Sequence, residues 1–110
     1  MGRISHTNII VDNFYYGQSN SSYNYVYFLS HMHSDHYQGL TNEWCHGPIY
    51  CSEITKRVLL NKFPRIKGVI GLEMNKLYEI YLNEDKSLKV DVMLFDANHI
   101  IGSAMFLFEG

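Results

Sequence analysis

Residues 28–36 read FLSHMHSDH and place His31, His33, Asp35 and His36 within one short segment directly after a β-prone run. Zinc prefers imidazole and carboxylate ligands, and ionisable groups this crowded are costly to bury unless a cation binds between them. His31 and His33, separated by one residue, can hold one metal, while the adjacent Asp35 and His36 indicate a second position. The spacing therefore predicts a two-metal site, for which hydrolysis is the obvious chemistry.

Two other interpretations of this cluster are a histidine-rich surface loop and a closed structural zinc site. Structural zinc sites favour cysteine, which the cluster lacks, so the catalytic interpretation is preferred. His99 follows a further predicted strand in the segment Asp96–His99, where it could complete the ligands of the first metal. A single histidine is more often a hydrogen-bonded polar residue than a metal ligand. His99 is proposed as a ligand only because the first cluster predicts a metal site.

Length and composition set the class of protein. The chain has 110 residues, of which 46% are hydrophobic, so we expect one small globular domain without a second. It shows no signal peptide and no apolar run long enough for a bilayer, which predicts an intracellular protein with no membrane partner. Cys45 and Cys51 do not form a CxxC pair and are expected to be free, mostly buried thiols. The net charge of −2 carries no basic surplus for nucleic acid.

Periodicity predicts a strand-rich α/β or α+β fold with few helices. A helix is expected from Glu53 to Phe63, capped by Ser52 and ended by Pro64, with Ile54 and Val58 four residues apart on its apolar side. Residues 67–74 show little period, and residues 77–82 and 88–96 predict a hairpin. The segment 102–108 reads as a central strand. The other expected strands are 8–12, 25–29, which suits burial on both faces, and 48–51.

Several segments together resemble one family. Residues 28–40 are similar to the HxHxDH region of the Apollo/Artemis branch of the metallo-β-lactamase superfamily, the DNA cross-link repair nucleases. Val11-Asp12, residues 50–55, and residues 96–99 followed by 102–110 agree with that branch in order and spacing. HxHxDH alone marks only the superfamily, which includes lactamases, glyoxalases and lactonases. The later blocks narrow the resemblance to nucleic-acid hydrolases; the last block looks like Apollo, and others look equally like the larger cross-link repair paralogue.

The resemblance implies a fold, a site and an activity. The fold would be the N-terminal half of an αββα metallo-β-lactamase domain, spanning residues 1–110 without the β-CASP region. His31, His33 and His99 would hold one zinc ion, Asp35 and His36 would hold or orient the second and serve catalysis, and Asp12 would fix a ligand histidine. The reaction would be phosphodiester hydrolysis from 5′ ends of DNA, in cross-link repair, telomere-end processing and end joining in the nucleus.

The sequence also departs from the family pattern. It ends before the GDF-type aspartate that bridges the metals, and Ile100-Ile101 stand where the family usually has Cys-Pro. We therefore expect weak binding of the second metal and little or no nuclease activity from these 110 residues alone. The alternatives are another hydrolase of the superfamily, similar to glyoxalases or lactonases, and a truncated, non-catalytic product that binds metal.

Overall fold

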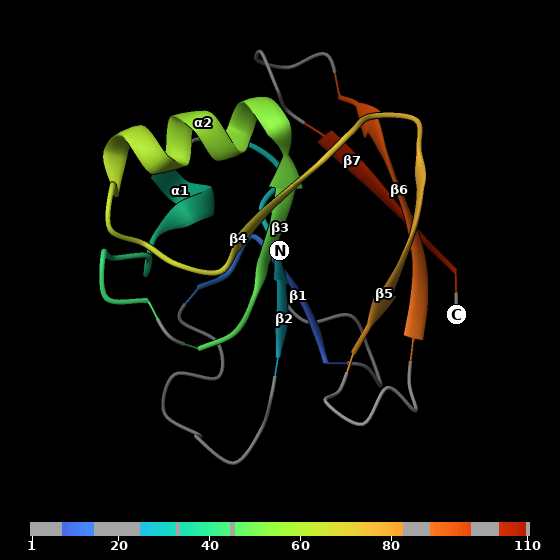
Figure 1. The fold of residues 1–110 in the computed structure, drawn as a ribbon, viewed down its shortest axis with the longest axis horizontal. Coiled ribbons are helices and arrows are strands. Elements are labelled where there is room, and N and C mark those ends of the chain that lie inside the picture. The colour runs from blue at the N-terminus through green and yellow to red at the C-terminus, as the bar shows by residue number, and fades with distance from the viewer. Residues whose placement is uncertain are drawn as a thin grey trace.

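The computed structural model describes residues 8–14, 25–32, 34–44, 46–82, 89–97 and 104–109. Strands dominate these residues, with one short and one longer helix among them (Figure 1). In chain order the elements are β1 (Ile9–Val11), β2 (Val26–Phe28), α1 (Ser34–Tyr37), β3 (Ile49–Ser52), α2 (Glu53–Lys62), β4 (Val69–Leu72), β5 (Leu77–Tyr81), β6 (Lys89–Asp96) and β7 (Ala104–Glu109). The prediction of a strand-rich α/β chain with few helices is confirmed.

The first four strands form a parallel sheet in the order β1-β2-β3-β4. Every residue of β1 and β2 is buried, which confirms the expectation that the run around Tyr25 to Leu29 is covered on both faces. Continuous apolar strands are typical of parallel sheets, because other elements cover both of their sides. The carboxyl ends of these strands consequently meet at one edge of the sheet.

The last three strands form an antiparallel sheet in the order β5-β6-β7. The register Leu77↔Met93 to Tyr81↔Lys89 confirms the predicted hairpin between β5 and β6. The prediction of a central strand for residues 102–108 is wrong within the described part of the chain, where β7 pairs only with β6. Alternating exposure along β7, with Met105 and Leu107 open to solvent, is typical of a sheet that is covered on one face.

Two hydrophobic cores divide the molecule into layers. One core lies between the two sheets and contains Val11, Phe28 and Leu94, with Phe106 and Phe108 packed against it. The other lies between the parallel sheet and the helices and contains Tyr27, Trp44 and Leu59. Figure 1 shows the same order, with α1 and α2 on one side of the parallel sheet and the antiparallel sheet on the other. The parallel sheet is thus the central layer.

Helix α2 begins where the sequence predicts but presents a different face. The Ser52 side chain accepts a hydrogen bond from the Thr55 amide at 3.1 Å, which confirms the predicted cap. Thr55 and Leu59 are the buried residues of the helix, whereas Ile54 and Val58 are 43% and 46% exposed. The prediction that Ile54 and Val58 form the packed side is therefore wrong by one position around the helix.

Two elements were not predicted. β4 falls in the segment 67–74, where the sequence VIGL is short and contains a glycine, so neither strand nor helix periodicity is visible. α1 is a single turn, too short to show a helical period. Among the described residues, no helix is long and apolar enough to cross a membrane.

Candidate metal centre

Three of the predicted site residues, Asp12, His31 and His36, lie together at the carboxyl edge of the parallel sheet. Asp12 directly follows β1, and Ser30 and His31 follow β2. The Asp12 amide donates a hydrogen bond of 2.9 Å to the Phe28 carbonyl, which extends the pairing of the two strands to the site. Sites in α/β sheets form preferentially outside the carboxyl ends of the strands, where neighbouring loops converge.

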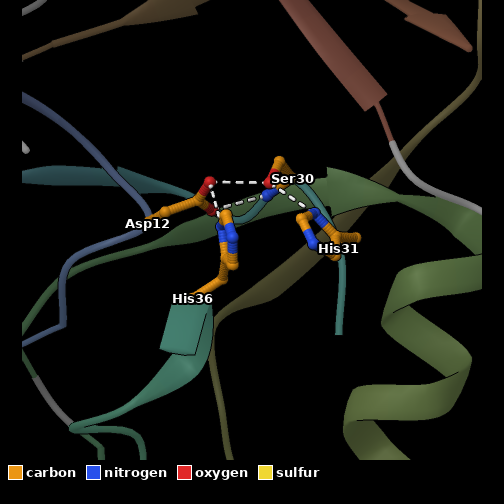
Figure 2. A network of polar contacts seen from close by, with 4 residues as sticks. All are labelled: Asp12, Ser30, His31 and His36. Carbon is orange, nitrogen blue, oxygen red and sulfur yellow. Dashed lines mark hydrogen bonds and ion pairs between the residues drawn. The ribbon is translucent and has the colours of Figure 1, made fainter. Parts of the chain in front are cut away.

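Asp12 is held at the centre of a polar network (Figure 2). Its side chain is only 1% exposed. One carboxylate oxygen, Oδ1, accepts from the Ser30 amide at 2.7 Å, and Oδ2 accepts from the Ser30 hydroxyl at 2.6 Å. The residue adopts a left-handed backbone conformation with φ of 52°, which is uncommon outside glycine and clusters at functional sites. The fold thus fixes the direction of this carboxylate.

The rings of His31 and His36 lie beside each other, with the His36 ring next to this carboxylate (Figure 2). Their centroids are 4.1 Å apart, with an angle of 48° between the ring planes. His36 comes from α1 and places Nδ1 2.9 Å from Asp12 Oδ2, while His31 places Nδ1 2.9 Å from Ser30 Oγ. His31 is 8% exposed and the side chain of His36 is 25% exposed, so solvent reaches the pair mainly through His36.

The donor chemistry of this pair fits a divalent metal such as zinc. Ligand histidines commonly turn one ring nitrogen toward a carboxylate or another polar group and bind the metal through the other nitrogen. Both rings show this arrangement toward Asp12 or Ser30 through Nδ1. Considering only the residues that the structure describes, no three histidine, cysteine, aspartate or glutamate side chains are arranged so that they could hold a metal ion together. The described residues thus place two of the predicted ligands, His31 and His36, beside each other, with their Nε2 atoms not used in these hydrogen bonds.

The other predicted ligands fall outside what the structure describes. His33, His99 and the Asp35 side chain are in this group, although the Asp35 backbone belongs to α1. The Ala104 amide, which follows the segment containing His99, donates to the Ser30 carbonyl at 2.9 Å and so fixes the start of β7 beside the site. The roles of these residues, and those of Asp12, His31 and His36 toward a metal, remain predictions.

Sequence reasoning missed Ser30 as a member of the network. Its only visible signal is a hydroxyl group directly before the first histidine of the motif. Its partner Asp12 is 18 positions earlier in the chain, and only the pairing of β1 with β2 brings the two together.

Cys51 is an unsuitable metal ligand or nucleophile, although it lies in β3 of the same sheet. It is a free cysteine with no exposed surface, as predicted, while Cys45 falls in a part that the structure does not describe. Burial raises the pKa of the Cys51 thiol to about 12, so the thiolate, which is the form that binds metals and attacks substrates, is disfavoured.

A strand-rich α/β chain with a histidine pair fixed by a buried aspartate defines a candidate metalloprotein, and known proteins narrow the class further. The chain is 47% identical over 85 residues to the DNA cross-link repair protein pso2/snm1 of Schizosaccharomyces pombe. It is 43% identical over 86 residues to the 5′ exonuclease Apollo of Danio rerio, and 40% identical over 110 residues to the mouse DNA cross-link repair 1A protein. These matches cover 76%, 77% and 97% of the chain, respectively. No family model matches it.

The chain belongs to the family that contains the DNA cross-link repair protein pso2/snm1 and the 5′ exonuclease Apollo. The identities of 47% and 43% do not separate the pso2/snm1 type from the Apollo type. The chain spans 14% of the length of pso2/snm1, 15% of Apollo and 10% of the 1A protein.

Proposed function

We propose that this chain forms the N-terminal part of a metallo-β-lactamase domain whose activity is the metal-dependent hydrolysis of DNA from 5′ ends in cross-link repair. The observation that carries this proposal is the polar network of Asp12, Ser30, His31 and His36, found in a chain 43% identical to a 5′ exonuclease over 86 residues. The layering of a parallel sheet between helices and a second sheet supports the fold.

The proposed roles follow from where the side chains lie. His31 and His36 would hold zinc through Nε2, with His33, Asp35 and His99 as the further ligands. A zinc ion held there would lower the pKa of a water molecule and stabilise the negative charge that develops on the phosphate during hydrolysis. Asp12 keeps the two rings in place, since it is buried and contacts His36 directly and His31 through Ser30.

The proposal can be tested by transferring the site into a relative of known class. In a chimera, the matched 86-residue region of the Danio rerio Apollo exonuclease is replaced by the corresponding residues of this chain. Because His31 and its partners would rebuild the metal site in the complete enzyme, we expect cleavage of 5′-phosphorylated single-stranded DNA when zinc is present. Substitution His31→Ala in the chimera should abolish this cleavage, and chelation should suppress it.

The chain alone is assayed in parallel. A chimera that folds and takes up zinc but leaves the DNA intact would contradict the proposed function. Equal cleavage by the chimera and its His31→Ala variant would contradict the proposed site.

A further inference from the structure

We infer that Ser30 is a positioning residue whose hydroxyl donates to Asp12 and accepts from His31. Through this hydroxyl and through direct contact with His36, one buried carboxylate selects the tautomer of both histidines. The inference deepens the proposed function, on which it depends for the role of the histidines as metal ligands. The tautomers themselves are a property of the metal-free chain and can be measured without it.

The argument begins with the single proton of the Ser30 hydroxyl. Oγ of Ser30 lies 2.6 Å from Asp12 Oδ2 and 2.9 Å from His31 Nδ1. An ionised carboxylate can only accept hydrogen bonds, so the hydroxyl proton of Ser30 points to Asp12. Towards His31, the same oxygen is then an acceptor, and Nδ1 of His31 has to carry the proton of that hydrogen bond.

The second histidine meets the same carboxylate directly. Nδ1 of His36 lies 2.9 Å from Asp12 Oδ2 and also has to donate. In a neutral imidazole only one ring nitrogen carries a proton, and the other has a lone pair. Both rings are thereby set with the lone pair on Nε2, the nitrogen through which each would bind a metal.

Asp12 cannot easily turn to release this arrangement. Its side chain is 1% exposed, and Oδ1 is held by the Ser30 amide at 2.7 Å. Reversing the hydrogen bonds would leave a buried donor or acceptor without its partner, which costs about 1–3 kcal/mol per group. Ser30 donates to both carboxylate oxygens, to Oδ1 through its amide and to Oδ2 through its hydroxyl (Figure 2).

The inference predicts which ring nitrogen carries the proton. Nitrogen-15 NMR distinguishes protonated from unprotonated imidazole nitrogens, and it is applied to the full chain after chelation, at a pH where both rings are neutral. We expect His31 and His36 each to carry the proton on Nδ1. If His31 in the unsubstituted chain carries it on Nε2, the inference is overturned, whatever the variants do.

Two variants of Ser30 separate a tautomer effect from general damage. Ser30→Ala removes the hydroxyl, so His31 should lose its Nδ1 proton preference while His36, which contacts Asp12 directly, keeps its own. Ser30→Thr retains the hydroxyl and should keep both tautomers. An unchanged His31 tautomer in a folded Ser30→Ala chain would refute the role of Ser30. A shift of the His31 proton from Nδ1 to Nε2 in Ser30→Thr would refute it as well.

Asp12→Asn provides a reversal that a merely structural role would not produce. With its oxygen retained at the Ser30 amide, the asparagine NH₂ group takes the place of Oδ2 and donates to Ser30 and His36. The Ser30 proton then turns to His31, and both histidines should carry their protons on Nε2. If both stay protonated on Nδ1 in this variant, Asp12 does not direct them.

Zinc affinity gives a second readout, with Zn²⁺ alone as the probe. Ser30→Ala should weaken zinc binding by about 10–100-fold, the usual effect of removing a group that orients a ligand, and Ser30→Thr should restore it. Equal zinc affinity of the unsubstituted chain, Ser30→Ala and Ser30→Thr would contradict the positioning role of Ser30. These outcomes are separate from the proposed function, because the tautomers can be as inferred in a chain that never cleaves DNA.

Discussion

At the residue scale, Asp12 combines an unfavourable backbone conformation with a carboxylate whose two oxygens both accept hydrogen bonds. A left-handed conformation costs a non-glycine residue about 1–3 kcal/mol, and φ is 52° here. The carboxylate offsets this cost by accepting from the Ser30 amide, the Ser30 hydroxyl and His36. The family resemblance predicts Asp12 as a residue that fixes a ligand histidine, but not the strained backbone or the serine partner.

Gly47 is required by a close approach of two backbone segments. Its φ is +152°, and a Cβ atom there would lie 2.2 Å from the Tyr25 carbonyl oxygen. Gly47→Ala should lower the free energy of unfolding by about 2–5 kcal/mol, because backbone strain adds to overpacking that neither segment can relieve. Urea denaturation followed by circular dichroism measures this loss.

Gly68→Ala is the matched control for that substitution. Gly68 has a φ of +81°, but a Cβ atom would meet nothing closer than 4.0 Å. Only the strain of about 1–2 kcal/mol should then appear. Equal losses for the two variants would show that the contact with Tyr25 is unimportant.

At the element scale, the face of α2 is decided by what the helix packs against. Ile54 with Val58 and Thr55 with Leu59 have the same spacing, so periodicity alone does not distinguish the two pairs. The structure buries the pair containing Leu59 against the parallel sheet, in the core that also holds Cys51. The sequence therefore predicts the helix and its cap but not its orientation.

This assignment of the face predicts opposite results at neighbouring positions. Leu59→Ala removes a side chain with no exposed surface and should cost about 2–5 kcal/mol of stability. Val58→Ala removes one that is 46% exposed and should change stability by no more than about 0.5 kcal/mol. Thermal unfolding measures both, and a larger loss for Val58→Ala would restore the face that periodicity favours.

At the scale of the whole molecule, local sequence patterns predict most of the helices and strands. They do not predict which residues far apart in the sequence come into contact. The elements β1, β2, β3 and α2 and the β5–β6 hairpin follow from short-range signals and are confirmed, although their ends differ from the predicted ends. β4 was missed because its identity as a strand comes from pairing with β3. Similarly, spacing predicts the histidine cluster, whereas the contact between Asp12 and Ser30 depends on which strands are neighbours.

The two sheets should unfold together, because aromatic side chains join them. The rings of Phe28 and Phe108 lie 4.9 Å apart, one on β2 and the other on β7. Phe108→Ala should therefore lower stability by about 1–3 kcal/mol and shift the unfolding midpoint seen by Trp44, which lies in the other core.

Leu107→Ala is the control for this coupling, since Leu107 is 48% exposed and should have almost no effect. Fluorescence of Trp44, the single tryptophan, follows the transition. If the midpoint reported by Trp44 stays fixed in a folded Phe108→Ala chain, the two layers unfold independently.

Zinc uptake by the folded chain tests the central claim most directly. We predict that the chain, freed of metal with a chelator and refolded, binds zinc in a competition titration. The substitution His31→Ala should weaken this binding by at least about 10-fold. His46→Ala is the matched control, because His46 lies beside Trp44 before the amino end of β3, at the opposite edge of the sheet, and should leave binding unchanged. A folded chain that takes up neither zinc nor manganese, or one in which the His31→Ala and His46→Ala variants bind zinc equally well, would contradict the account.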